Sequence, residues 1–397
     1  MMGPRSAVLL CAALLACSGA PTDGPAGPAD PIGDPPQPVE PAPVRPFADY
    51  RLYFDSNREG DPIGWSMKEI FSLRADGSGL RRITDNAVDI NVPAFRIAPD
   101  GGTIAYEGEY EPGCGRRPGS RPCGPGEEPM YAMDVVLIGT DGTDRRNLTN
   151  GIVTHPVPDL AFLSDPQWSP DGNTLAYAAL LPDGWSIHTL DPGTGADVRL
   201  TTGPLSWKPR WSPSGEHIAF LRLGPGNTWQ MALMPATGGS PTIVTALPNG
   251  TGAAWSPDGT QMALTILGTA GTWHVEVIGA DGRGRRSISG ELVNAGNPDW
   301  DPAGRCIVFQ AESDGGLAIF RVDLPDGPPQ LLTAFPQGYR AEVPVISPDG
   351  GIVAFIARPP GGRYEAWVVR IDGSDPHQVT AVGPVSQVAF DPRVPAQ

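Results

Sequence analysis

Trp168-Ser169-Pro170-Asp171-Gly172 and Trp255-Ser256-Pro257-Asp258-Gly259 are one short sequence written twice, and they decide the fold. Proline presets φ for a turn, while Asp and Gly tolerate the conformations that reverse the chain. Related copies stand at 98–101, 212–215, 301–304 and 347–350, and a partial copy stands at 391–392. Their prolines are 43 to 46 residues apart, except for one interval of 71. A tight turn repeated at this period indicates a repeat fold.

Apolar segments flank each turn. An apolar triplet follows it, as in Leu175-Ala176-Tyr177, and a third strand such as 69–73 comes next. A fourth strand then carries an apolar residue and a hydroxyl residue, as in Leu200-Thr201. Two residues before the turn proline stands an aromatic or apolar residue, which is Ile97, Trp168, Trp211, Trp255, Trp300, Ile346 or Phe390. Four short strands per roughly 44 residues are typical of a β-propeller blade.

The sequence therefore predicts an all-β fold, a β-propeller of four-stranded blades. Seven fourth strands predict seven blades, and six remain the alternative if one unit is degenerate. The chain begins on a second strand near Tyr50 and ends on a first strand at Phe390. We therefore expect residues 386–392 to form the innermost strand of the first blade, so that the C-terminal strand closes the ring and covers its open edge.

The N-terminal residues predict export and a lipid anchor. Residues 1–16 have a basic start and a short apolar segment, as a signal peptide does. Leu14-Leu15-Ala16-Cys17 resembles the bacterial lipobox, which implies lipidation at Cys17; an ordinary signal peptide is the alternative. Residues 17–47 form a Pro- and Gly-rich tether, and residues 48–397 form the propeller. With Ser18 after the cysteine, the sequence resembles that of an outer-membrane lipoprotein. We therefore expect an envelope protein facing the periplasm or the cell surface.

The repeat also resembles a known family. Trp-Ser-Pro-Asp-Gly at 168–172 and 255–259, followed by an apolar triplet and a Leu-Thr strand, is similar to the TolB-type propeller repeat, a relative of the WD repeats. The stretch at 54–60 resembles that family as well. The resemblance covers about residues 50–392 and implies the fold. It leaves function open, because propellers include enzymes, scaffolds and binding proteins.

Charge and motifs narrow the function. A net charge of −16, from 28 Lys and Arg against 44 Asp and Glu, excludes a nucleic-acid binder that relies on a basic surface. The stretches around Ser66 and Ser186 lack the closing glycine of a nucleophile elbow. The five histidines have no metal-ligand spacing, so we expect no metal and no cofactor. The sequence thus predicts a protein without enzymatic activity, and the alternative is a hydrolase or lyase that acts on envelope glycan or peptide at the channel mouth.

Two cysteines bound the clearest departure from the repeat. Cys114 and Cys123 flank a short Gly- and Pro-rich loop, and in an exported chain this pattern predicts a disulfide. Two free thiols are the alternative. The loop accounts for much of the 71-residue interval, and it carries Arg116, Arg117 and Arg121 on an otherwise acidic protein. Cys306 lies in an apolar strand, where we expect it to be buried and inert.

The expected binding face is the one on which loops lead into the innermost strands around the channel. We expect it to bind an envelope protein or a peptidoglycan-associated component, so that the protein is a lipid-anchored binding or scaffold module. Aromatic and Arg side chains there are of the types enriched in binding hot spots. The alternative is that they only cap strands. The candidates are Asp89, Asn91, Asp165, Trp207, Lys208, Asn249, Asn297, Tyr339, Arg340 and Glu342, with Arg116, Arg117 and Arg121 of the loop between Cys114 and Cys123 above them.

Overall fold

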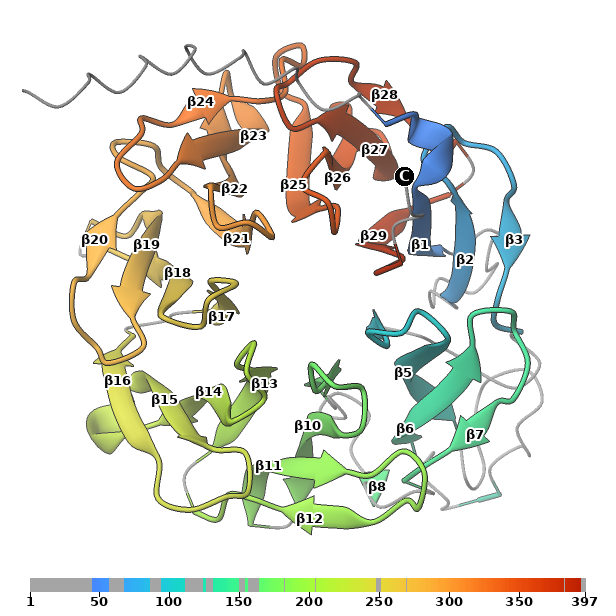
Figure 1. Ribbon diagram of the computed structural model, residues 1–397, viewed down its shortest axis with the longest axis vertical. Helices are drawn as coiled ribbons and strands as arrows, with labels where there is room; N and C mark the ends of the chain where they lie inside the picture. The colour runs from blue at the N-terminus through green and yellow to red at the C-terminus, as the bar shows by residue number, and fades with distance from the viewer. Residues whose placement is uncertain are drawn as a thin grey trace, which may run out of the picture. The chain divides into compact units, whose positions relative to one another are not determined.

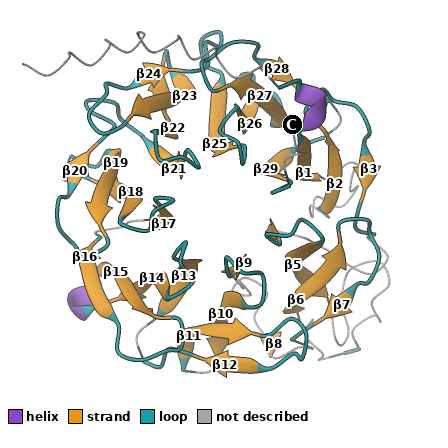
Figure 2. Ribbon diagram, in the orientation of Figure 1, coloured by secondary structure: helices purple, strands orange, loops and turns teal. Residues whose placement is uncertain are grey.

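The computed structural model describes residues 45–393, with gaps at 57–67, 86–93, 111–123, 126–130, 150–153, 156–163, 182, 204, 248–250, 269 and 382. The chain divides into two units, Met1–Pro43 and Val44–Gln397, and the described residues belong to the second. This second unit is a β-propeller in which four-stranded sheets surround a central axis (Figure 1). Strands dominate it, and its described helices are two 3-10 turns, η1 (Phe47–Asp49) and η2 (Pro225–Asn227) (Figure 2).

Four sheets among the described residues have four strands each. In the first, β29 (Val385–Phe390) lies inside β1 (Arg51–Ser56), β2 (Glu69–Arg74) and β3 (Arg81–Arg82). The others run from the axis outward as β9 (Ser164–Trp168), β10 (Leu175–Leu181), β11 (Gly184–Leu190) and β12 (Asp197–Arg199); β13 (Ser206–Trp211), β14 (His217–Leu223), β15 (Trp229–Pro235) and β16 (Thr242–Ala246); and β17 (Thr251–Trp255), β18 (Gln261–Leu267), β19 (Trp273–Gly279) and β20 (Arg286–Ser287).

The remaining two sheets are larger. One joins β4 (Phe95–Ile97), β5 (Thr103–Tyr110), β6 (Tyr131–Gly139) and β7 (Arg146–Asn147), with β8 (Thr154–His155) paired to β6. The other has eight strands, which are β21 (Gly296–Trp300), β22 (Cys306–Ser313), β23 (Gly316–Asp323), β24 (Gln330–Leu331), β25 (Arg340–Ile346), β26 (Ile352–Arg358), β27 (Glu365–Arg370) and β28 (His377–Gln378).

The count of hydrogen-bonded sheets differs from the prediction. The described residues form six sheets, not seven separate ones. The reason is one parallel bridge between Leu317 of β23 and Arg340 of β25, which merges two sets of four strands into the eight-stranded sheet. The coarser prediction, an all-β propeller with four-stranded blades, is confirmed.

The last strand of the chain pairs with the first. β29 is antiparallel to β1, with Phe390 opposite Leu52 and Val388 opposite Phe54. The carboxylate of Asp55, which is 1% exposed, accepts hydrogen bonds from the backbone N–H groups of Ser386 (2.8 Å) and Gln387 (2.7 Å). A buried carboxylate that is satisfied in this way ties two distant parts of the chain together, and leaving it without these donors would be costly.

The repeated turn has a side-chain reason. The Ser169 hydroxyl donates to Asp171 Oδ1 (2.6 Å), and its oxygen accepts the N–H of Thr174 (3.0 Å). Gly172 has φ +72°, a left-handed conformation that favours glycine, and its N–H donates to the Ser169 carbonyl (2.9 Å). The hydrogen bond from Ser169 lowers the pKa of the Asp171 carboxyl. The same Ser-to-Asp bond recurs in the turns at 256–259 and 347–350.

The Leu-Thr pairs also act through a repeated contact. The sequence predicted that each pair lies within the outermost strand. In most blades it lies directly after that strand instead. The hydroxyl oxygen then accepts a backbone N–H of the third strand, as Thr84 does from Ile70 (2.9 Å) and Thr201 from Ile187 (2.8 Å). This bond satisfies a donor beyond the end of the short outer strand. The fourth strands are therefore present but shorter than expected.

The apolar triplets after the turns form the core. Ile104, Ala105 and Tyr106 are fully buried, and the equivalent residues of the other blades are buried to a similar degree. Core clusters combine side chains of adjacent sheets, so that Leu52 and Phe54 of β1 pack in one cluster with Ala354 and Ile356 of β26. Burial of each large side chain contributes about 1.5–3 kcal/mol, so these clusters stabilise the contacts between adjacent blades.

Candidate functional site

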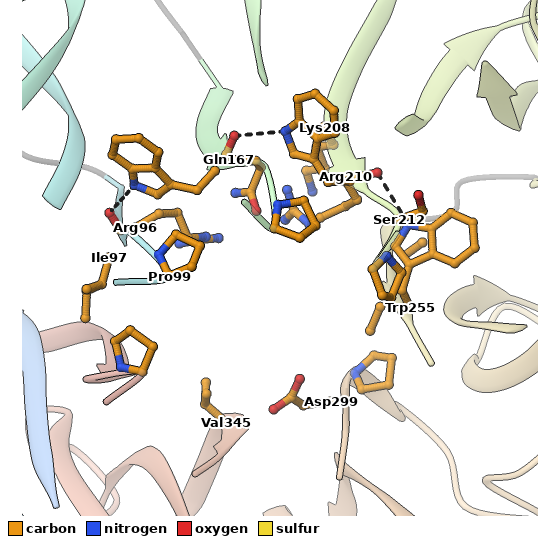
Figure 3. A pocket seen from close by; sticks show the side chains of 18 of the residues that line it. Arg96, Ile97, Pro99, Gln167, Lys208, Arg210, Ser212, Trp255, Asp299 and Val345 are labelled. Carbon is orange, nitrogen blue, oxygen red and sulfur yellow. Dashed lines mark hydrogen bonds between the residues drawn. The ribbon is translucent and has the colours of Figure 1, made fainter. Parts of the chain in front are cut away.

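A cavity of about 770 Å³ lies at the centre of the propeller. Its wall comes from the innermost strands β4, β9, β13, β17, β21 and β25, together with turn prolines such as Pro99, Pro170 and Pro213 (Figure 3). The volume lies within the range of sites that hold small ligands or a short segment of chain. The cavity is therefore the candidate binding site.

One column of the repeat supplies several polar groups of the cavity. Successive residues of a strand point to opposite sides, so the residue before each aromatic position faces the channel. Asp299 and Val345 stand in this column on β21 and β25. The other members that line the cavity are Arg96, Gln167, Arg210 and Ala254. None of the candidates expected from the sequence lies in this column, although its place in the repeat could have indicated it.

The aromatic column holds neighbouring blades together. The Trp168 indole N–H donates to the Arg96 carbonyl (3.2 Å), and that of Trp211 donates to the Gln167 carbonyl (3.1 Å), as the dashed lines in Figure 3 show. Trp255 and Trp300 make the same bond to the strand before them. Each Trp thus fixes the backbone of the residue whose side chain enters the cavity, which makes the wall rigid.

One side of the cavity is basic. Arg96, Gln167, Lys208 and Arg210 come from β4, β9 and β13, and Figure 3 shows them across the cavity from Asp299 and Val345. A guanidinium N–H of Arg96 donates to the Phe95 carbonyl (2.7 Å), which orients that side chain along its own strand. Three cationic side chains on one wall favour an anionic ligand group.

Backbone bulges place part of this lining. The pairing of β13 with β14 shifts register between Trp207 and Arg210, and Lys208 has φ +53° there. Asn297 and Val343 have φ of +51° and +55° at the equivalent bulges of β21 and β25. A β-branched residue in this conformation is a true outlier, and such strain is concentrated at binding and catalytic sites. The bulges re-aim the lining side chains into the cavity.

Asp299 is the acidic group of the opposite wall. Its Oδ2 accepts the backbone N–H of Ile346 (2.7 Å), which belongs to the next innermost strand. Burial raises the pKa of Asp299 from its ordinary value to about 6, against the lowering effect of the hydrogen bonds from Ile346 and Trp300. The carboxyl therefore titrates close to neutral pH, within a site that also holds cations.

The structure separates the sequence candidates into groups. Lys208 and Asn297 line the cavity, whereas Trp207, Tyr339, Arg340 and Glu342 are not among its lining residues. Asp165 is described only as backbone of β9. The candidates Asp89, Asn91, Asn249, Arg116, Arg117 and Arg121 lie outside the described residues, as do Cys17, Cys114 and Cys123.

The candidates outside the cavity make local contacts. Lys208 Nζ lies 4.9 Å from the ring of Trp207, and the Trp207 ring lies 6.0 Å from that of Trp229. The Trp207 indole N–H is buried and has no hydrogen-bond partner among the described residues. Tyr339 stacks on Phe335 at 5.2 Å. These aromatic residues therefore pack against neighbouring side chains and are not part of the cavity lining.

A Ser-His-Asp arrangement lies away from the cavity. Ser186 Oγ is 3.0 Å from His188 Nε2, and His188 Nδ1 is 3.0 Å from Asp197 Oδ2. The order of groups is that of a hydrolase triad. However, Ser186 is 0% exposed and His188 is 3% exposed on a paired strand, so a substrate carbonyl could not reach the hydroxyl. The three groups satisfy one another in the core.

Other chemistry is limited in the part of the chain that the structure describes. No three His, Cys, Asp or Glu side chains gather there in a way that could hold a metal ion. Cys306 is buried and free, as expected, and burial raises the pKa of its thiol to about 11. No helix within these residues has the length and apolar character needed to cross a bilayer.

Comparison with known proteins agrees with this geometry. A sequence profile described as the TolB beta propeller domain matches residues 203–392. Over these residues the propeller is of the TolB type. No curated protein matches the chain in sequence. TolB from Acinetobacter baumannii is similar in structure, with 16% identity and a TM-score of 0.51 over 82% of this chain and 79% of that chain.

Other solved structures share the fold. A puromycin-hydrolyzing peptidase from Mycobacterium tuberculosis has 15% identity and a TM-score of 0.57, and the match covers 87% of this chain and 55% of the peptidase. An oligogalacturonate lyase in complex with manganese has 14% identity and a TM-score of 0.54, over 83% of this chain and 84% of the lyase. At these identities the similarity shows the fold alone.

Proposed function

We propose that this protein is a binding module of the bacterial envelope that holds a short segment of a partner protein in its central cavity. The TolB-type fold supports a protein-binding module. The observation that carries the proposal is the polarity of the cavity, with Arg96, Lys208 and Arg210 on one wall and Asp299 on the other. This arrangement matches a segment that carries both an acidic group and hydrogen-bond donors.

The basic wall favours a carboxylate. A guanidinium binds a carboxylate through two parallel N–H···O bonds, and such charge-assisted bonds are stronger than neutral ones. The chain as a whole has a net charge of −16, so three cations in one cavity form a local attractive site on a protein that otherwise repels acidic partners. An acidic side chain of the partner is therefore expected to contact Arg96 and Arg210.

The opposite wall favours donors and apolar groups. Asp299 offers carboxylate oxygens to a partner N–H, and Ala254, Val343 and Val345 lie beside it. The turn prolines add a rigid apolar collar. A short extended segment presents backbone N–H groups and alternating side chains to such a surface, whereas a folded domain would not enter a cavity of about 770 Å³.

The test is capture of envelope proteins by the intact protein and by an Arg96→Ala, Arg210→Ala double variant. We expect the double variant to keep its unfolding midpoint and to lose at least about tenfold in affinity, because each charge-assisted bond contributes about 1.5–3 kcal/mol. Arg199→Ala, on the outer strand β12, is the matched control. Equal capture by all three proteins would contradict a site in the cavity.

We also propose that Cys17 carries the lipid that anchors the protein, in the outer membrane and facing the periplasm or the cell surface. The support is the Leu14-Leu15-Ala16-Cys17 sequence and the Pro-rich tether that follows it. Cys17→Ala should release the protein from membranes. A mature N-terminus at another residue, found unmodified by mass spectrometry, would contradict the proposal.

For the ring itself, we propose seven blades closed by β29. The eight-stranded sheet is held together at its middle by one bridge, Leu317 to Arg340, which supports counting it as two blades of four strands. The pairing of β29 with β1 supports closure, because it gives the first blade its innermost strand. A closed ring leaves no open edge, and this keeps the cavity wall continuous.

A further inference from the structure

Two arginines face each other on the β25–β26 strand pair. Arg340 of β25 is directly opposite Arg358 of β26 in the antiparallel register. Like charges in directly opposed positions destabilise a sheet unless anionic groups compensate them. Neither residue lines the central cavity, so the pair belongs to a separate part of the surface.

The compensation within the described chain is incomplete. Glu342 Oε1 accepts the Nε–H of Arg340 (2.8 Å) and the hydroxyl of Tyr364 (2.5 Å). Arg358 instead lies over the Tyr364 ring, 5.0 Å from its centre. The Nε–H of Arg358 is buried and has no hydrogen-bond partner among the described residues. The one carboxylate thus pairs with Arg340 and with the Tyr364 hydroxyl, and a buried donor of Arg358 is left over.

One arginine of the pair is accessible, and both are oriented. The Arg340 side chain is 43% exposed, so part of it reaches solvent. Tyr364 contacts the surroundings of both arginines. Its hydroxyl donates to Glu342, the partner of Arg340, and its ring lies under the guanidinium group of Arg358. The Pro359-Pro360-Gly361-Gly362 loop beside them ends at Arg363, which adds positive charge. Preorganised guanidinium groups with spare donors form an anion site at little entropic cost.

We propose that Arg340 and Arg358 form an oxyanion-binding site, for a carboxylate or phosphate group, that is separate from the central cavity. The anion would take the spare donors of both guanidinium groups and supply the charge that Glu342 alone does not. Tyr364 positions the arginines and Glu342 holds Arg340. The site does not depend on the function proposed for the cavity, because it shares no lining residue with it.

The test uses the intact propeller and small anions. Sodium phosphate and sodium succinate are titrated at ionic strength matched with sodium chloride, and binding is followed by calorimetry and by the rise in unfolding midpoint. We expect saturable binding, which weakens about tenfold or more in Arg358→Gln and in Arg340→Gln. Arg358→Lys should weaken it as well, since lysine keeps the charge but loses the planar pair of donors.

The two titrations, with phosphate and with succinate, distinguish the sources of the anion. Binding of phosphate alone assigns a phosphate group, and binding of succinate assigns a carboxylate; either supports the site. Arg199→Gln, which removes an arginine paired with Asp183, is the matched control and should bind as the parent protein does. The proposal is overturned if neither anion binds beyond the effect of chloride. Binding that is unchanged in both Arg358→Gln and Arg340→Gln, with folding intact, also overturns it.

Discussion

The contacts between blades are built in two ways. On β9, β13, β17 and β21 the aromatic column is a Trp, and each indole N–H donates to a carbonyl of the strand before it. At the remaining positions of the same column stand Ile97, Ile346 and Phe390, which have no side-chain donor. The two regions have the same backbone arrangement, so the difference shows which part of the contact the repeat requires.

Other groups replace the indole where Trp is missing. The backbone N–H of Ile346 donates to Asp299 (2.7 Å), and the Gln387 side-chain amide donates to the Phe95 carbonyl (2.8 Å). Between β1 and the turn after β25, the Tyr50 hydroxyl donates to Asp349 (2.9 Å). The repeat thus requires a hydrogen bond at each contact between adjacent blades, here called a seam, but it does not require a particular residue. One replacement has a further consequence, because it puts the carboxylate of Asp299 into the cavity.

An N-terminal segment, residues 45–50, reinforces the seam near the chain ends, where the aromatic column has no Trp. Arg45 pairs with Asp349 at 3.4 Å, and the Phe47 ring packs edge-on against His377 at 4.5 Å. Arg370 lies 4.4 Å from the centre of the Phe47 ring. Residues 45–50 therefore act as a strap across β27, β28 and β1. The Trp-containing seams are local to adjacent repeats, whereas this seam uses both ends of the chain.

Removing the last strand should have the largest effect. Deletion from Val385 onward removes the buried side chains of Val385, Val388 and Phe390, which contribute about 5–9 kcal/mol together. It also leaves Asp55 buried without its donors. We expect loss of cooperative unfolding in urea, because the loss is comparable to the stability of a whole domain. Deletion of 394–397 alone is the control, and equal midpoints for the two truncations would refute closure by β29.

Removing a Trp should have the next largest effect. Trp300→Ala deletes a side chain that is 8% exposed and its bond to Ala254, and should cost about 3–5 kcal/mol in urea unfolding. Trp300→Phe keeps an aromatic ring and loses the donor, so it should cost about 1 kcal/mol. If Trp300→Phe were as damaging as Trp300→Ala, the indole bond would matter more than the packing. If neither variant lowered the midpoint, the seam account would be wrong.

The Asp299 seam should make stability depend on pH. The native pKa of about 6 lies above the ordinary 3.8, so the native state holds this proton more tightly than the unfolded chain. The contribution is fully present below pH 4 and is lost as the pH rises to about 6, on the order of 2–3 kcal/mol. Asp299→Asn keeps an acceptor for Ile346 and should remove this part of the pH profile.

Thermal unfolding at pH 4, 5, 6 and 7 measures the difference between the parent protein and Asp299→Asn. The difference should grow in favour of the variant between pH 4 and 7. A constant difference over this range would show that Asp299 does not titrate as its burial implies. Asp183→Asn, at an exposed carboxylate outside the cavity, is the matched control.

The strap should have the smallest effect. Phe47→Ala removes the edge contact with His377 and the cation–π contact with Arg370. These contacts contribute about 1–2 kcal/mol together at a partly exposed site. We expect a modest fall in unfolding midpoint and faster exchange of the Tyr50 amide hydrogen. Leu80→Ala, at an exposed position near β3, should change neither quantity. If Phe47→Ala behaved as Leu80→Ala does, residues 45–50 would not stabilise this seam.

The fold could be predicted from the sequence because its signals are local. The Ser-Pro-Asp-Gly turn is stabilised by its own side chains, and the triplets that follow it are buried as strands of a core are. The pairing of the chain ends followed from counting strands. The merger of two strand sets through Leu317 and Arg340 could not be predicted, because one bridge between the strands β23 and β25 leaves no periodic signal.

The site was only partly predictable, for a related reason. Lys208 and Asn297 were selected because the sequence predicted them in loops that lead into innermost strands; they lie within β13 and β21 and line the cavity. Asp299 and Arg210 were missed, although they occupy a fixed place before the aromatic column. The strand period predicts that this column faces the axis, but the backbone bulges decide how far each side chain reaches. The Cys114–Cys123 disulfide and the loop arginines stay predictions.

Cross-linking from inside the cavity tests the central claim most directly. A photo-cross-linking amino acid at Val345, which lines the cavity, should attach to an envelope protein at a short segment that contains Asp or Glu. The product should disappear when Arg96 and Arg210 are both changed to Glu. The same probe at Val198, which is 55% exposed on β12, should give no such product. Cross-links at Val198 but none at Val345 would contradict the account and move the binding site to the outer rim.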